Sequence, residues 1–237
     1  FQMGHKLAFE FAEKLTSILP TNINHMFFSN SGSEAVDSAL KIALAYYKAK
    51  GKVSKTKFIG RSRGYHGSGF GGTSVGGIVA NRQQYGNLLN GVIHLPHTHI
   101  PAKNSFSWGQ PKHGKEKADA LNEIIDFHGK ETIAAVIVEP IAGSTGVLVP
   151  PQGYLEKLRK ICSENDILLI FDEVITGFGR VGASFASNRF GVYPDIITLA
   201  KGITNATVPM GAVGVSSEIY NTIYNKNKEK IELFHGY

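Results

Sequence analysis

The sequence predicts an α/β fold in which a mainly parallel β-sheet carries helices on both faces. Short apolar runs alternate along the chain with longer segments whose apolar residues recur at helical spacing. Two of the runs, residues 167–171 and 196–200, are too short for independent helices and too continuous for half-exposed strands. The 237 residues are enough for a continuous hydrophobic core, and no internal repeat or linker divides them.

The chain is predicted to begin with an amphipathic helix and a short strand. Apolar side chains recur at helical spacing from Leu7 to Leu19, and Pro20 ends the pattern. The apolar residues 26–28 that follow are typical of a short buried strand.

A turn of small polar residues then leads directly into a helix that carries apolar residues from Ala35 to Leu44. Such a turn leaves free N–H groups and the positive end of a helix dipole pointing outward, an arrangement that suits a phosphate. An ordinary N-cap by Ser31 or Ser33 explains the same residues. The turn is not a P-loop, because no lysine followed by serine or threonine comes after the glycine.

The next predicted strand, residues 57–60, is followed by a segment dense in glycine, residues 61–77. Within it Tyr65, His66 and Gly67 stand out, because a backbone with few side chains lets an aromatic ring lie flat against a ligand. A flexible surface loop explains the glycines equally well.

Three imidazoles, those of His94, His97 and His99, raise the question of a metal site. Prolines make this stretch extended, and neither a cysteine nor a carboxylate lies nearby. We therefore expect loop histidines and no metal. The segment 101–117, rich in Pro, Lys, Gly, Ser and His, is expected to be a long surface excursion.

The remaining elements continue the alternation of strands and helices. Helices are expected over residues 119–128 and 153–165, and strands over residues 134–138 and 211–216, with a last helix from Ser217. The strand 134–138 ends at Glu139 and precedes a glycine-containing turn.

The chain is organised around residues 167–201. One buried strand delivers Asp172 and the other delivers Lys201, so a carboxylate and an amine reach the same edge of the sheet. An unpaired buried charge is costly, so the two groups neutralise each other or something bound between them uses both. Pyridoxal phosphate would use both, since its aldehyde forms a Schiff base with a lysine and its ring nitrogen needs an acid partner. A plain ion pair, or two charges that end strands at the surface, is the structural alternative.

Charge and composition bear on possible partners and on the compartment. The net charge is +6, but the lysine clusters at residues 48–57 and 226–230 look like solvated surface and lack the interleaved aromatics that stack on bases. We therefore expect no nucleic-acid partner. No apolar run is long enough for a membrane span and no signal peptide is visible, so we expect no membrane association. The single cysteine, Cys162, is expected to be a packed thiol, which indicates a reduced compartment and a cytoplasmic location.

Five stretches together resemble the class III pyridoxal-phosphate-dependent aminotransferases, also called omega-aminotransferases. They are NSGSEA at residues 30–35, GYHG at 64–67, VEP at 138–140, FDEVITGFGR at 171–180 and LAKG at 199–202. Each is weak alone, but they occur in order and cover the whole chain. The resemblance implies that residues 1–237 are the large domain of a fold-type-I transferase that binds pyridoxal 5'-phosphate.

The resemblance also implies a role for six residues. Gly32 and Ser33 would hold the phosphate, Tyr65 would stack on the pyridine ring, and Val174 would pack on its other face. Asp172 would pair with the ring nitrogen and Lys201 would form the Schiff base, so these two would be the catalytic residues. Physically the set is coherent, because Asp172 keeps the nitrogen protonated and the freed Lys201 can move a substrate proton.

The turn at residues 142–146 and the segment 204–213 resemble the omega-amino acid (β-alanine):pyruvate aminotransferases. Many relatives that act on ornithine or 4-aminobutyrate have a glutamate where this chain has Ser144. Ile175 stands where some relatives place a glutamine near the ring hydroxyl. The expected reaction moves an amino group from an omega-amino acid or amine to pyruvate.

Both ends of the chain look cut from something longer. The family implies a preceding segment that walls the substrate site and a small C-terminal domain with an arginine for the substrate carboxylate. It also implies a homodimer. A non-catalytic fragment that at most binds the cofactor is one alternative, and another reaction on the same fold, such as decarboxylation, is a second.

Overall fold

The computed structural model describes residues 4–226, which contain a seven-stranded sheet of order β1-β7-β6-β5-β4-β2-β3. Neighbouring strands from β3 through β6 run parallel, whereas β7 is antiparallel to both β1 and β6. The strands are β1 (His25–Ser29), β2 (Lys57–Arg61), β3 (Val92–Leu95), β4 (Ile133–Val138), β5 (Leu168–Asp172), β6 (Ile196–Leu199) and β7 (Gly211–Val215). The predicted mainly parallel α/β architecture is confirmed.

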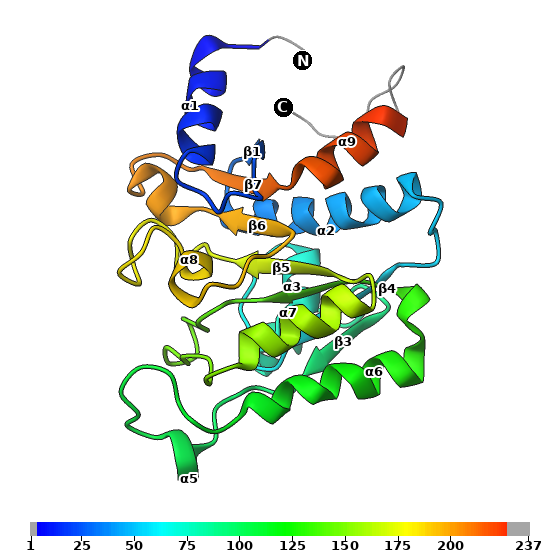
Figure 1. Cartoon of the computed structure of the whole chain (residues 1–237), viewed down its shortest axis with the longest axis vertical. Helices are drawn as coiled ribbons and strands as arrows, with labels where there is room; N and C mark the ends of the chain where they lie inside the picture. Colours follow the sequence, from blue (N-terminus) through cyan, green and yellow to red (C-terminus); the bar gives the residue numbers. More distant parts are fainter. Residues whose placement is uncertain (1–3, 227–237) are drawn as a thin grey trace.

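Helices cover both faces of this sheet (Figure 1). The long helix α2 (Gly32–Ala49) packs on one face together with α9 (Ser217–Lys226), and α6 (Ala120–His128) and α7 (Tyr154–Glu164) pack on the other. The other helices are α1 (Lys6–Thr16), α3 (Phe70–Val75), α4 (Val79–Arg82), α5 (Pro101–Asn104) and α8 (Ala186–Phe190), with 3-10 turns η1 (Lys115–Asp119), η2 (Lys130–Thr132) and η3 (Lys201–Thr204). None of the helices within residues 4–226 is long and apolar enough to cross a membrane.

The two-residue period of a strand explains how one sheet supports both helical layers. In β4, Ala135 and Ile137 belong to the core beneath α2, while Val136 and Val138 belong to the core beneath α6 and α7. Every residue of β4 and β5 is buried, as their continuous apolar runs predicted. Cys162 is also buried as predicted, and burial raises the pKa of its thiol to about 12.

The alternation of strands and helices fails at one point. Strands β6 and β7 are joined by η3 and an irregular segment, with no α-helix between them. A parallel crossover needs a longer connection, usually a helix, so β7 returns antiparallel beside β6. The prediction of strict alternation was therefore wrong here, although the strand itself was predicted correctly.

The glycine-rich segment 61–77 is packed rather than loose, which rules out the flexible-loop interpretation. It contains α3, in which Gly71, Gly72, Ser74 and Val75 are buried. A Cβ atom at Gly72 would collide with the carbonyl oxygen of His66. The glycines therefore let the backbone fold closely onto itself.

The first of the three histidines lies in strand β3 and not in a loop. His94 Nε2 lies 2.7 Å from Arg82 Nη1 and 2.9 Å from the carbonyl oxygen of Gly76. Burial and the nearby guanidinium of Arg82 lower the pKa of His94. Among residues 4–226, no three His, Cys, Asp or Glu side chains lie close enough together to hold a metal ion.

Candidate active site

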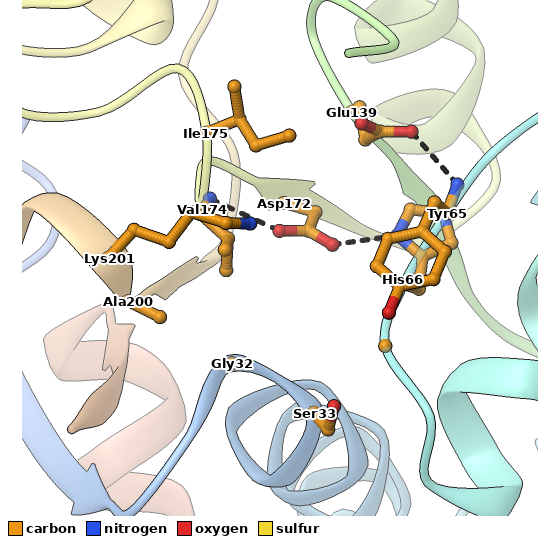
Figure 2. Close-up of a pocket in the computed structure, with 11 residues that line it drawn as sticks. Gly32, Ser33, Tyr65, His66, Glu139, Asp172, Val174, Ile175, Ala200 and Lys201 are labelled. Atoms are coloured by element: carbon orange, nitrogen blue, oxygen red, sulfur yellow. Dashed lines mark hydrogen bonds and ion pairs between the residues drawn. The ribbon is translucent and has the colours of Figure 1, made fainter. Parts of the chain in front are cut away.

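The carboxyl ends of β5 and β6 form one wall of a cavity of about 160 Å³. These strands are parallel neighbours, with Asp172 opposite Thr198, so the residues that end them reach the same edge of the sheet. The cavity is lined by all six residues predicted from the sequence, Gly32, Ser33, Tyr65, Asp172, Val174 and Lys201. Figure 2 shows Lys201 and Val174 on one side of Asp172, Tyr65 on the other, and Gly32 and Ser33 facing them from α2.

The carboxylate of Asp172 is held through both of its oxygens. His66 Nδ1 lies 2.8 Å from Oδ2, and the backbone N–H of Val174 donates to Oδ1 at 3.2 Å. The Asp172 residue is only 5% exposed. Its side-chain partner within the described part of the chain is therefore His66, and the simple Asp172–Lys201 pair considered above is wrong.

His66 adds a buried acceptor to the cavity wall. Its side chain is fully buried, and Nε2 has no hydrogen-bond partner within residues 4–226. If Nδ1 carries the proton that it shares with Asp172, Nε2 has a free lone pair. A buried polar atom without a partner is uncommon in a folded protein.

Lys201 begins η3 with an exposed side chain and no ion pair among residues 4–226. Its backbone is in the left-handed region, with φ of 46°, which is unfavourable for a residue with a Cβ atom. The turn packs closely on Phe178 at the adjacent Gly202, where a Cβ atom would lie 2.9 Å from Cβ of Phe178. Close packing of η3 on Phe178 thus fixes the position of the lysine.

The N-terminus of α2 has an ordinary N-cap and also lines the cavity, so both interpretations of its sequence, a helix cap and a phosphate site, remain compatible with the structure. Ser31 is the ordinary cap, since its Oγ accepts a hydrogen bond from the Glu34 N–H at 3.1 Å. Gly32 and Ser33 nevertheless line the cavity, and N–H groups of a first helical turn have no partner inside the helix. A Cβ at Gly32 would lie 3.2 Å from Cβ of Ala200, so glycine allows the helix to come this close.

Two buried glutamates were not predicted as site residues. Glu139 lines the cavity, and burial raises the pKa of its carboxyl. It ends a buried strand just as Asp172 does, so the same sequence signal could have identified it. Glu173 is fully buried but does not line the cavity. Its carboxylate accepts hydrogen bonds from Thr176 Oγ1 and from the N–H groups of Ala186 and Ser187.

The donor set fits pyridoxal phosphate. Lys201, which has no acidic partner among residues 4–226, and an anchored carboxylate face one cavity. A helix N-terminus lies at another side of it, and Gly32 lets that helix approach closely. Together with the sheet topology, these features define a pyridoxal-phosphate-dependent enzyme of fold type I.

Comparison with known proteins agrees with this class. The family model for class III aminotransferases matches residues 2–236, so the chain belongs to the class III aminotransferases, which are pyridoxal-phosphate-dependent enzymes. The chain is 62% identical to an omega-aminotransferase of Caulobacter vibrioides and 52% identical to the omega-amino acid–pyruvate aminotransferase of Pseudomonas putida. Each alignment covers 100% of this chain but only 54% and 53% of the respective relatives. The chain therefore spans about half the length of the relatives it matches.

Solved structures show the same fold. An amine transaminase from an uncultivated Pseudomonas species, in its PLP-bound form, has a TM-score of 0.92 at 39% identity and covers 100% of this chain and 54% of its own. The omega-transaminase of Pseudomonas jessenii in complex with PMP has a TM-score of 0.91 at 37% identity, covering 99% of this chain and 52% of its own.

Proposed function

We propose that residues 1–237 form the cofactor-binding large domain of a transaminase that moves an amino group from an omega-amino acid or an amine to pyruvate. The observation that carries this proposal is the convergence of Asp172 and Lys201 on one cavity from neighbouring parallel strands. The relatives named omega-amino acid–pyruvate and beta-alanine–pyruvate aminotransferase, each 52% identical to this chain, support the donor and acceptor classes.

Residues on three sides of the cavity would hold the cofactor. The first N–H groups of α2, at Gly32 and Ser33, would bind its phosphate, because a helix N-terminus carries partial positive charge. Tyr65 and Val174 would pack on opposite faces of the ring. Asp172, oriented by His66 and by the N–H of Val174, would hold a proton on the ring nitrogen.

When bound, the cofactor supplies an electron sink for the charge left when a substrate C–H proton departs. Lys201 would anchor the cofactor and then act as the base that takes up this proton at Nζ and returns it to a carbon of the bound cofactor. The lack of an ion pair to Lys201 within the described residues suits this role, since no salt bridge restrains the side chain at the cavity.

The proposal extends to the oligomeric state, location, partners and amino-donor preference of the whole protein. We propose that the whole protein is a cytoplasmic homodimer without a nucleic-acid or membrane partner, on the basis of the family resemblance and the composition. Ser144, exposed in the turn after β4, would favour omega-amino acids and amines over donors that need a glutamate at this position.

Chemical trapping tests the proposal directly. The protein is incubated with pyridoxal phosphate, reduced with borohydride and mapped by peptide mass spectrometry. The label is expected on Lys201. Selective labelling of another lysine, such as Lys57, would contradict the assignment of the site, and a Lys201→Ala variant that is labelled as fully as the native protein would do the same.

A further inference from the structure

Glu139 connects two loops that meet at the cavity. Its Oε1 accepts a hydrogen bond from the backbone N–H of Tyr65 at 2.9 Å, and its Oε2 accepts one from Gly143, also at 2.9 Å. The residue is only 4% exposed, and its own carbonyl oxygen accepts from Arg61 Nη2 at 2.7 Å. Figure 2 shows the Glu139 carboxylate beside Tyr65 at the rim of the cavity.

The two loops have different positions relative to the site. One loop carries Tyr65 into the cavity wall, and the other is the turn between Ala142 and Leu148, which are paired as an isolated β-bridge. A second link joins them further from the cavity, where Thr145 Oγ1 donates to the carbonyl oxygen of Arg63 at 2.9 Å in an exposed setting. Of these two links between the loops, the one through Glu139 is buried and contacts Tyr65.

We propose that Glu139 is a positioning residue, whose carboxylate sets the place of the Tyr65 ring against the cofactor and holds the turn after β4 in register with it. This inference rests on the proposed function, since it assumes that the cavity binds pyridoxal phosphate. Glu139 acts through the backbone of Tyr65, and no bond from it to a bound molecule is needed.

A carboxylate is required here because two N–H donors reach it from different loops. Each donor uses one of its oxygens, and both oxygens of an ionised carboxylate are acceptors. A glutamine has only one acceptor, so its amide NH₂ would face one of the two N–H groups. Burying this carboxylate costs free energy. The other titratable side chains that line the same cavity are those of Tyr65, His66, Asp172 and Lys201.

Protonation should have the same effect as the amide. A protonated carboxyl offers a donor at one oxygen, so one of the two loop contacts is lost. Burial raises the pKa of Glu139, with the charge of Asp172 acting in the same direction, while His66 and the two N–H groups lower it. Acidification should therefore loosen the Tyr65 loop.

A double-mutant cycle on cofactor affinity tests the inference. Dissociation constants for pyridoxal phosphate are measured by absorbance for the native protein, Glu139→Gln, Tyr65→Ala and the double variant, with Thr145→Val as the control for the peripheral link. Glu139→Gln should weaken binding about tenfold, the loss of one hydrogen bond to a charged group. In the Tyr65→Ala background the same substitution should weaken it less than about twofold, because there is no ring left to position.

The outcomes separate the two proposals. If the native protein does not bind pyridoxal phosphate, the proposed function fails. If it binds but the effects of Glu139→Gln and Tyr65→Ala multiply, or Thr145→Val weakens binding as much as Glu139→Gln, Glu139 has only a general structural role and the inference fails.

A pH titration of cofactor affinity needs no Glu139 variant, so it tests the inference even if Glu139→Gln does not fold. Affinity of the native protein should fall on acidification by a larger factor than that of Tyr65→Ala. The other ionisable groups of the cavity and those of the cofactor are common to both proteins. Parallel pH profiles would overturn the inference.

Discussion

His66 Nδ1 lies 2.8 Å from Oδ2 of Asp172, and the two residues belong to segments 106 positions apart in the sequence. The contact orients a carboxylate at the end of a central strand, and the other imidazole nitrogen has no hydrogen-bond partner among the described residues. The function of this carboxylate and the function of its partner can be tested separately.

Replacing Asp172 with asparagine removes the charge but keeps the size of the side chain. The amide cannot hold the ring nitrogen protonated, so we expect the half-reaction of the intact enzyme to slow roughly 100-fold or more. The cofactor should still bind, because the phosphate and Lys201 contacts remain. Stopped-flow absorbance with an amino donor measures the rate, and near-normal turnover would exclude a role for a protonated ring nitrogen.

Replacing His66 tests the partner. Asparagine places an amide N–H near the position of Nδ1, whereas leucine has nearly the same shape and no donor. We expect His66→Leu to lower cofactor affinity about tenfold through the lost charge-assisted bond, and His66→Asn to recover most of it. Fluorescence titration of the apoprotein gives both affinities. Equal losses in the two variants would mean that volume, and not the hydrogen bond, is what the site needs.

Gly67 is expected to tolerate no side chain. Its φ of 95° is unfavourable for other residues, and a Cβ would lie 2.7 Å from Cα of Ser33 in the first turn of α2. Gly182 has a similar φ of 77° with open space around it, so Gly182→Ala is a matched control for the backbone cost of about 1–2 kcal/mol. Gly67→Ala should lower both stability and cofactor affinity, whereas Gly182→Ala should lower stability alone. Urea denaturation measures the stability of each variant and absorbance titration measures its cofactor affinity. Equal changes in both quantities for the two variants would contradict the steric argument.

Lys55, two residues before β2, is buried, so the prediction that the lysines at residues 48–57 are solvated surface was wrong for this one. Its Nζ donates to the carbonyl oxygens of Lys130, Ile133 and Asp166 at 2.8, 3.0 and 2.6 Å. Lys55→Met should destabilise the protein by about 1–3 kcal/mol at pH 7, because these acceptors lose their donor. Lys52→Met, at an exposed pair with Asp166, should cost less than about 1 kcal/mol. Comparable losses of unfolding free energy in the two variants would show that the buried contacts are weak.

The same lysine predicts a pH dependence. Burial lowers its pKa to about 8 from the ordinary value of 10.5, so between these values the unfolded chain binds more protons than the folded one. Stability attributable to Lys55 should therefore rise from about pH 8 to 10.5, and this rise should be missing in Lys55→Met. Denaturation curves at pH 7 and pH 9.5 measure it, and the same change with pH in both proteins would contradict the shift.

The fold could be predicted from local patterns of apolar residues, because β4, β5 and β6 are buried on both faces and are therefore continuous apolar runs in the sequence. They also placed Asp172 and Lys201 at one edge, since parallel strands share their carboxyl ends. His66 could not be assigned to Asp172 in this way. Their contact depends on the order β5-β4-β2, which brings the loop after β2 over the end of β5, and no local pattern specifies that order. The reversal of β7 was missed because apolar periodicity has no direction.

The pairing of β1 with β7 has a consequence for how the protein is made. His25 pairs with Val215, so the first strand finds its neighbour only after almost all of the described chain has left the ribosome. The turn that begins at Ser29 follows this strand directly, and Gly32 in it lines the cavity. Loop closure over such a sequence distance is slow compared with local helix formation. During synthesis, the central parallel strands can assemble first, and the side of the cavity formed by the start of α2 is completed last.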